Sequence, residues 1–227
     1  EYSMLPRANR ERSRRDISKL KLNGRSAEIQ RLIGRALRSV VDMKKLGPWN
    51  ITIDCDVLQG DGGPRTASIT GGFVAMMLAF RKMMEAGQLA EYPISGYVAA
   101  VSAGIVDDVP LLDLCYEEDS AAMVDLNCVM DDQGRLIEIQ GTGEGRPFTL
   151  EEQQKLVELC EKGIRRLQAF FTEMGQPSTL AGLGIDSRHL AQMAYKATHW
   201  PDGSPKPLGG LKKLSEQDAL AVYQLAL

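Results

Sequence analysis

Apolar residues recur every three or four positions across residues 26–46, which predicts an amphipathic helix with one buried side. Ser26 is a residue type that can cap its start, and Gly47-Pro48 follows its end. A second helix is predicted over residues 64–87, because proline is favoured in a first helical turn. A third is predicted to begin at Thr149-Leu150-Glu151-Glu152, which has the spacing of a capping box, and to reach at least Phe171.

Strict alternation of apolar and polar residues over 51–57 predicts a strand with one buried face. Four further strands are predicted at residues 97–106, 111–117, 122–130 and 136–140. Short polar turns separate them, which favours an antiparallel meander. With residues 1–24 as a basic arm or loop, the order of elements indicates an α+β domain whose helices pack on a sheet.

The sequence changes character after Phe171. Residues 175–179 interrupt the helix, residues 201–210 are rich in glycine and proline, and a last short helix is predicted near Ser215. No strand pattern is found here. We therefore expect a small, separate helical tail.

Composition places the 227-residue chain among globular proteins, with 44% hydrophobic and 25% charged residues. No apolar run is long enough to cross a bilayer, so no membrane partner is expected. The four cysteines form no C-x-x-C pair. Buried, reduced thiols are the favoured interpretation, which indicates the cytoplasm.

Positive charge is concentrated at the start of the chain. Residues 1–45 carry 13 Lys and Arg against 5 Asp and Glu, although the whole chain has a net charge of −3. Such a block can be merely solvated, but its density favours a polyanion, and nucleic acid in particular.

Two aspartates are candidates for acid–base or metal chemistry. Asp119 and Asp125 are predicted to lie at a strand-turn-strand junction, where carboxylates on neighbouring antiparallel strands can face one another. Such a pair can share a proton or bind a divalent cation. Alternatively, Asp119 shapes the turn and Asp125 faces solvent.

Two predicted helix starts carry an arginine each, in Gly62-Gly63-Pro64-Arg65-Thr66 and in Gly24-Arg25-Ser26. Free amides at a helix start and a guanidinium together bind phosphate well, although an ordinary capped turn is as common. Both arginines and the acidic pair together predict a site where inorganic phosphate and a metal meet one phosphodiester, which is a phosphorolysis site.

Several motifs, in order and without evident gaps through about Arg165, resemble the ribonuclease PH family. They are Met4-Leu5-Pro6-Arg7, Gly24-Arg25 through Ile33, Ile53-Asp54-Cys55-Asp56-Val57, Gly62-Gly63 with Arg65-Thr66-Ala67-Ser68, Val98-Ala99-Ala100-Val101-Ser102, Glu118-Asp119-Ser120-Ala121 and Ile139-Gln140-Gly141-Thr142.

This resemblance implies a ribosomal-protein-S5-domain-2-like fold and a phosphate-dependent 3′→5′ exoribonuclease, which trims transfer RNA precursors and other RNA 3′ ends and releases nucleoside diphosphates. It implies a hexameric ring, a trimer of dimers. Inorganic phosphate is the co-substrate and Mg²⁺ the cofactor. By position, the phosphate-binding residues are Arg25, Gly63, Arg65 and Thr66, the metal-binding catalytic residues are Asp119 and Asp125, and the RNA-binding residues are Arg7, Arg10, Arg12, Arg14, Arg15 and Arg31.

The chain departs from the family in three ways. It is expected to lack the family's N-terminal segment, Pro64 replaces a common threonine beside the phosphate site, and the tail resembles another family. Residues 168–180, 183–185 and 209–218 resemble the C-terminal helical end of iron-containing, butanol-type alcohol dehydrogenases. We therefore divide the chain into a catalytic domain, residues 1–167, and a tail, residues 168–227.

Two other functions stay open. One is a non-catalytic RNA-binding or ring-assembly remnant that keeps the basic arm. The other is an alcohol dehydrogenase fragment without activity, because no glycine-rich nucleotide motif follows a predicted strand.

Overall fold

The first helix begins two residues earlier than predicted and ends sooner. The computed structural model describes residues 1–9, 11–12, 23–173, 187–199, 204–205, 215–217 and 219–220. In it α1 spans Gly24–Arg38, and Asn23 caps it by accepting a hydrogen bond from the Arg25 amide at 3.1 Å. Ser26, the expected cap, is buried inside the helix, so that prediction was wrong.

The expected continuation of α1 to Leu46 was also wrong. Beyond Arg38 the backbone turns to donate from Asp42 to the Pro93 carbonyl, and Asp42 then caps a separate helix α2, Met43–Leu46. The apolar positions Val40 and Leu46 are nevertheless buried, as the periodicity indicated.

A short parallel pair of strands lies beside these helices. Strand β1, Tyr2–Met4, pairs with β2, Cys55–Val57, so the first residues are not the arm that was expected. The predicted strand over residues 51–57 has ladder pairing only in its last three residues. Ile51 and Ile53 still pack against the core. The alternation of apolar and polar residues therefore predicted which side chains are buried, but not which residues pair in a ladder.

The main sheet is not the predicted meander. It contains β3 (Val98–Val106), β4 (Val109–Leu112), β5 (Val124–Asp131) and β6 (Leu136–Thr142), in the spatial order β4-β3-β5-β6. Each of the three pairs is antiparallel, and β5 lies beside β3 rather than beside β4.

The connection from β4 to β5 explains this order. The predicted strand over residues 111–117 stops at Leu112, because Asp113 adopts a positive φ of 56° and helix α4, Tyr116–Ala121, follows. A capping box between Cys115 and Glu118 starts α4. The chain then returns to pair with β3.

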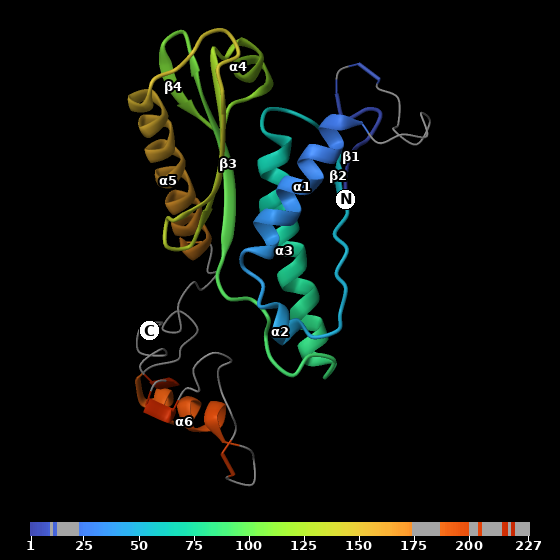
Figure 1. The fold of residues 1–227 in the computed structure, drawn as a ribbon, viewed down its shortest axis with the longest axis vertical. Coiled ribbons are helices and arrows are strands. Elements are labelled where there is room, and N and C mark those ends of the chain that lie inside the picture. Colours follow the sequence, from blue (N-terminus) through green and yellow to red (C-terminus); the bar gives the residue numbers. More distant parts are fainter. Residues whose placement is uncertain are drawn as a thin grey trace. The chain divides into compact units, whose positions relative to one another are not determined.

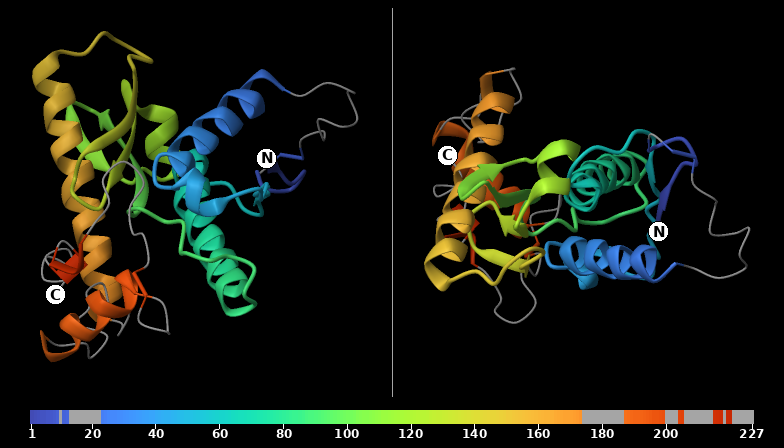
Figure 2. Two further views of the ribbon diagram at one scale, coloured as in Figure 1. Left: turned by 60° about the horizontal axis from the view of Figure 1, so that its bottom comes forward. Right: turned by 90° about the horizontal axis from the view of Figure 1, so that it is seen from above.

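Helices cover both faces of this sheet (Figures 1 and 2). On one face α1 and α3, which spans Pro64–Glu85, bury a core that includes Ile29, Phe80 and Val129. On the other face α5, Leu150–Glu173, packs Leu156 and Cys160 against the strands. The α+β class with helices packed on a sheet is confirmed.

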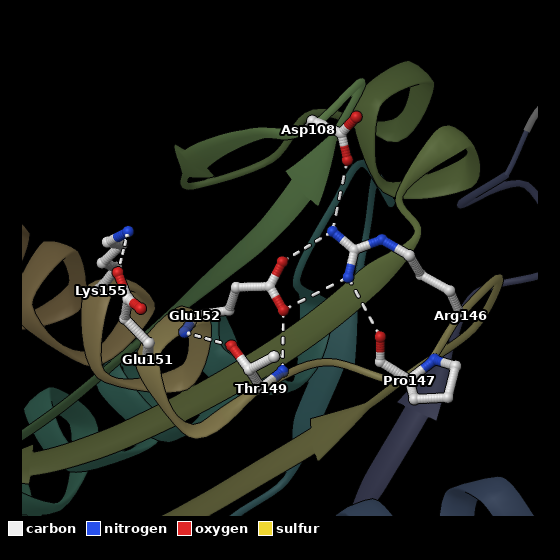
Figure 3. Close-up of polar contacts among 7 residues, drawn as sticks. All are labelled: Asp108, Arg146, Pro147, Thr149, Glu151, Glu152 and Lys155. Carbon is white, nitrogen blue, oxygen red and sulfur yellow. Dashed lines mark hydrogen bonds and ion pairs between the residues drawn. The ribbon is translucent and has the colours of Figure 1, made fainter.

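The predicted capping box at the start of α5 is present (Figure 3). Glu152 donates its amide to the Thr149 hydroxyl, and its carboxylate accepts from the Thr149 amide. Arg146 pairs with the same carboxylate at 2.7 Å and with Asp108 of the β3–β4 turn at 3.4 Å. The hydrogen bond from Arg146 is the largest cause that lowers the pKa of Glu152, to about 2.

The chain divides into two units, Glu1–Ile164 and Arg165–Leu227. In the second unit α6, Ser187–Thr198, buries Leu190 and Ala194, and Tyr195 stacks on His199 at 4.1 Å between ring centroids. The Ala219 amide donates to the Ser215 carbonyl, a helical turn at the predicted place. No helix among the described residues is long and apolar enough to cross a membrane.

We predict that Leu156→Ala lowers the free energy of unfolding by about 2–5 kcal/mol, because Leu156 is fully buried between α5 and the sheet. Leu150→Ala, at an 84% exposed position of the same helix, is the matched control and should change it by less than about 0.5 kcal/mol. Urea denaturation followed by circular dichroism measures both. Equal effects would show that α5 does not pack as described.

Candidate active site

Polar residues gather at one end of the sheet face that α1 and α3 cover. The apolar end of this face carries Val98, Ala100 and Val129. Further along, the register places Ser102 opposite Asn127 and Asn127 opposite Gln140, and the next row joins Gly104, Asp125 and Thr142. These positions share the face of the apolar residues, because side chains alternate along a strand.

Helix α3 begins over this polar end. Gly63 precedes it in a left-handed conformation with φ 60°, and a Cβ atom there would lie 2.8 Å from the Ser102 hydroxyl oxygen and 2.9 Å from that of Thr66. Only glycine fits this position without strain. Gly63 also leaves the helix start without a side-chain cap, which suits an anion ligand.

Thr66 is buried in the first turn of α3. Its hydroxyl donates to the Gly63 carbonyl at 2.8 Å, so the hydroxyl proton is engaged within the helix. Its assignment as a phosphate ligand stays a prediction. With the hydroxyl proton engaged, the group of Thr66 that can donate to phosphate is the backbone amide.

Arg65 reaches from α3 to two other elements. Its Nη1 donates to Gln140 of β6 at 2.9 Å and lies 3.4 Å from the Glu28 carboxylate of α1. Gln140 in turn donates its Nε2 to Glu28 at 2.9 Å. Gln140 and Glu28 therefore hold the guanidinium of Arg65, whose side chain is only 20% exposed.

Asp125 on β5 is half-buried, and burial is the main cause that raises its pKa. The negative charge of Asp119 raises the pKa further, and that of Glu144 adds a smaller effect. Arg65 and a 3.2 Å hydrogen bond from Asn127 act in the opposite direction. Asp119 and Arg65 therefore each lie within electrostatic range of Asp125.

Asp119 does not lie at a strand-turn-strand junction, which corrects the sequence-based placement. It is on helix α4, whose Tyr116 amide donates to Asp61 of the loop before α3 at 2.5 Å. The two carboxylates thus come together from a helix and a strand rather than from neighbouring strands. The spacing of the two residues could not distinguish these arrangements.

Arg25 lines a cavity of about 1040 Å³ together with Arg7, Asp119 and the buried Tyr2. Burial raises the pKa of Tyr2, whereas the nearby charges of Arg25 and Arg65 lower it. Both arginines therefore lie close to Tyr2. Pro64 and Asp119 also line this cavity. Arg65, which follows Pro64 in the chain, and Asp125 do not line it.

The expected RNA-binding arginines are only partly described. Arg7, Arg12 and Arg31 are exposed, which is compatible with contact to a polyanion. Arg10, Arg14 and Arg15 lie outside the described residues.

Sequence reasoning missed the partners of the charged groups. Glu28, Gln140 and Asn127 contact Arg65 or Asp125 directly, and the hydroxyls of Tyr2 and Ser102 are buried without a hydrogen-bond partner among the described residues. Glu28, Ser102 and Gln140 stand within the motifs that resemble ribonuclease PH. Their contacts needed the register of β3, β5 and β6.

No cluster of three or more His, Cys, Asp or Glu side chains suited to a metal occurs in the described part of the chain. Two carboxylates still fit Mg²⁺, which is commonly held by one or two carboxylates and substrate phosphates. A cation held by Asp119 and Asp125 would offset the charge of Asp119, which adds to the effect of burial in raising the pKa of Asp125.

Two family models match most of residues 1–163. Residues 1–82 match domain 1 of the 3′ exoribonuclease family, and residues 96–163 match domain 2. The chain belongs to the 3′ exoribonuclease family. The matched residues include the arginines and aspartates assigned above from the resemblance to ribonuclease PH, and they end before the tail, whose resemblance to alcohol dehydrogenases stays a prediction.

Two solved structures share the exoribonuclease-family fold. An archaeal exosome core matches with a TM-score of 0.53 and 24% identity over 65% of this chain and 64% of that one. An Archaeoglobus fulgidus exosome with RNA bound to the active site matches with a TM-score of 0.52 and 23% identity over 66% and 62%. The present chain thus spans less than two thirds of the length of each.

We expect Gly63→Ala to destabilise the protein more than Gly87→Ala does. Both glycines have positive φ, 60° and 69°, so alanine costs each about 1–2 kcal/mol of backbone strain. Only Gly63 is also crowded, by Ser102 and Thr66, whereas nothing lies within 4 Å of a Cβ at Gly87. Chemical denaturation compares the two variants, and equal losses would contradict the close approach of α3 to β3.

The raised pKa of Asp125 gives a second prediction. Because the folded state binds the proton more tightly than the unfolded state, the stabilisation from Asp125 is full below its ordinary pKa of 3.8 and is lost as the pH rises through the raised value. Asp125→Asn should therefore melt at a higher temperature than wild type at neutral pH without divalent cations. The difference should shrink toward roughly pH 4. An opposite pH trend in thermal melts would contradict the electrostatics described here.

Proposed function

We propose that this chain is a phosphate-dependent 3′→5′ exoribonuclease that trims RNA 3′ ends, those of transfer RNA precursors among them, and releases nucleoside diphosphates. The observation that carries the proposal is that Arg65, at the start of α3, and Asp119, on α4, both lie near enough to the half-buried Asp125 to shift its pKa. A helix start and a guanidinium favour an anion, whereas paired carboxylates favour a cation or a proton. Phosphorolysis of a phosphodiester uses both.

In this reaction an oxygen of inorganic phosphate attacks the phosphorus of the terminal phosphodiester. The bond to the 3′ oxygen of the preceding nucleotide breaks, and that oxygen takes the proton of the attacking phosphate. Arg65 and the start of α3 would orient the attacking phosphate, with Arg25 from the start of α1. Pro64 contributes no amide to this site, which we expect to weaken phosphate binding.

Asp119 and Asp125 are the proposed ligands of Mg²⁺. A bound Mg²⁺ supplies Lewis-acid stabilisation of the charge that develops on the phosphate oxygens and on the leaving 3′ oxygen. The protein contributes the placement of the two carboxylates, one from α4 and one from β5. Asn127, which donates to Asp125, fixes the second of them.

The basic residues 1–45 support RNA as the substrate. The exposed Arg7 and Arg31 offer positive charge near the cavity and along α1, where phosphates of a strand can bind. We further propose that several copies assemble into a ring, by similarity to the exosome structures, and that the ring is a homo-hexamer. Its location in the cytoplasm is part of the same proposal.

The test is release of nucleoside diphosphates from a transfer RNA precursor by the purified chain in Mg²⁺, with and without inorganic phosphate. Wild type should release them only with phosphate. Asp119→Ala and Asp125→Ala should each lower the rate about 100-fold or more, because either change removes a catalytic carboxylate. Asp132→Ala, at an exposed turn residue between β5 and β6, is the matched control and should keep the rate.

Two outcomes would contradict the proposal. Release of nucleoside monophosphates without phosphate would mean hydrolysis. The second outcome is that the sample binds RNA in a filter-binding assay but releases no nucleotide from it. This result would favour the non-catalytic RNA-binding remnant.

A further inference from the structure

We propose that Glu28 and Gln140 are positioning residues that fix Arg65 for inorganic phosphate and so set the affinity of the site for it. This inference rests on the proposed function, because it assigns Arg65 to phosphate. Neither residue is placed in contact with a reacting atom. They act through Arg65.

The contacts form a closed triangle between three elements. Gln140 on β6 accepts from Arg65 Nη1 through its Oε1 at 2.9 Å and donates from Nε2 to Glu28 at 2.9 Å. Glu28 on α1 completes the triangle with an ion pair of 3.4 Å to Arg65. The guanidinium of α3 is thereby tied to both α1 and the sheet.

The chemistry of position 140 is specific. A residue between a guanidinium and a carboxylate must accept a hydrogen bond on one side and donate one on the other, and the side-chain amide of glutamine does both. A glutamate there would still accept from Arg65 but would face the carboxylate of Glu28. A leucine there would remove the hydrogen bonds that position 140 makes to Arg65 and to Glu28.

The triangle uses only one nitrogen of Arg65. Nη1 makes both contacts, and among the described residues no partner is found for Nη2 or Nε. Those two nitrogens form the edge of a guanidinium that binds phosphate oxygens in pairs. Fixing Nη1 therefore presents that edge in one orientation, and phosphate binding need not order a free side chain.

The fold offers a matched control for this network. Arg35 on α1 pairs with Glu138 on β6, with Nε 2.9 Å from the carboxylate. This pair joins the same two elements, two residues along β6 from Gln140. Arg35 lies within electrostatic range of Glu28, but no contact of the pair with Arg65 is found among the described residues. Glu138→Gln therefore weakens the tie between α1 and β6 without removing any of the three contacts of the triangle.

The experiment is an exchange of the amide and the carboxylate. Four variants are compared with wild type, namely Gln140→Glu, Glu28→Gln, the double variant that carries both changes, and Glu138→Gln. In the double variant the amide now on α1 can donate to the carboxylate now on β6, and that carboxylate can accept from Arg65, so the triangle and its net charge return. Nucleoside diphosphate release gives the KM for phosphate, the KM for RNA and kcat, and isothermal titration gives the affinity for phosphate alone.

We expect Gln140→Glu to raise the KM for phosphate on the order of tenfold, with kcat at saturating phosphate and the KM for RNA within about twofold of wild type. Glu28→Gln should raise it less, because its amide oxygen still accepts from Gln140. The double variant should recover most of the phosphate affinity, since exchanged partners couple. Glu138→Gln should leave the KM for phosphate unchanged.

The inference fails if the double variant is no better than Gln140→Glu, if Glu138→Gln has the same effect, or if Glu28→Gln tightens phosphate binding. Any of these results with wild-type activity intact leaves the proposed function standing. If wild type releases no diphosphate but titration shows the same loss and recovery of phosphate affinity, the positioning role holds and the proposed function fails. If wild type binds no phosphate, both fail.

Discussion

The β4-β3-β5-β6 sheet has to cover both of its faces, and this requirement places helices α1, α3 and α5. Helix α5 covers one face, where Leu126, Cys128 and Leu156 form a purely apolar core. Helices α1 and α3 cover the other, where the strands are apolar at one end only. The second face therefore cannot be closed by hydrophobic packing alone.

The polar end of that face needs partners, since buried polar groups without hydrogen bonds are costly. The start of α3 meets this need with Arg65, whose guanidinium contacts Gln140 and lies close enough to Asp125 to lower its pKa. The balance is incomplete: Asp125 keeps a raised pKa, and the hydroxyl of Ser102 has no partner among the described residues. A place where the fold leaves polar groups partly unsatisfied is where a ligand gains most from binding.

The sequence predicted the burial pattern better than the backbone path. The periodic apolar residues from Ile29 to Val40 are buried as expected, yet α1 ends at Arg38 because hydrogen bonds near Asp42 pull the chain away. The alternation of apolar and polar residues over 51–57 likewise predicted which side chains face the core, but not the length of the strand. Such tertiary hydrogen bonds have no signature in a local pattern.

The candidate site was predicted as a set of residues, not as an arrangement. Motifs picked out Arg65, Asp119 and Asp125, but Asp119 was placed on a strand and lies on α4. The capping box there uses Cys115, which is not the Ser or Thr that marks such a box in a sequence, so the helix had no clear local signal. Gln140 and Glu28 stand far apart in the sequence, so only the strand register and the packing of α1 bring them to Arg65.

Phosphate, and not water, is the proposed attacking group on the phosphodiester at this site. Phosphorolysis is reversible, whereas hydrolysis does not run backward under these conditions, so the most direct measurement is the reverse reaction. The purified chain is incubated with Mg²⁺, an RNA with a free 3′ end and a nucleoside diphosphate, and RNA length and free phosphate are followed together. The RNA should grow by added nucleotides, with release of one phosphate for each. Binding of the RNA with neither growth nor phosphate release would contradict phosphorolysis at this site.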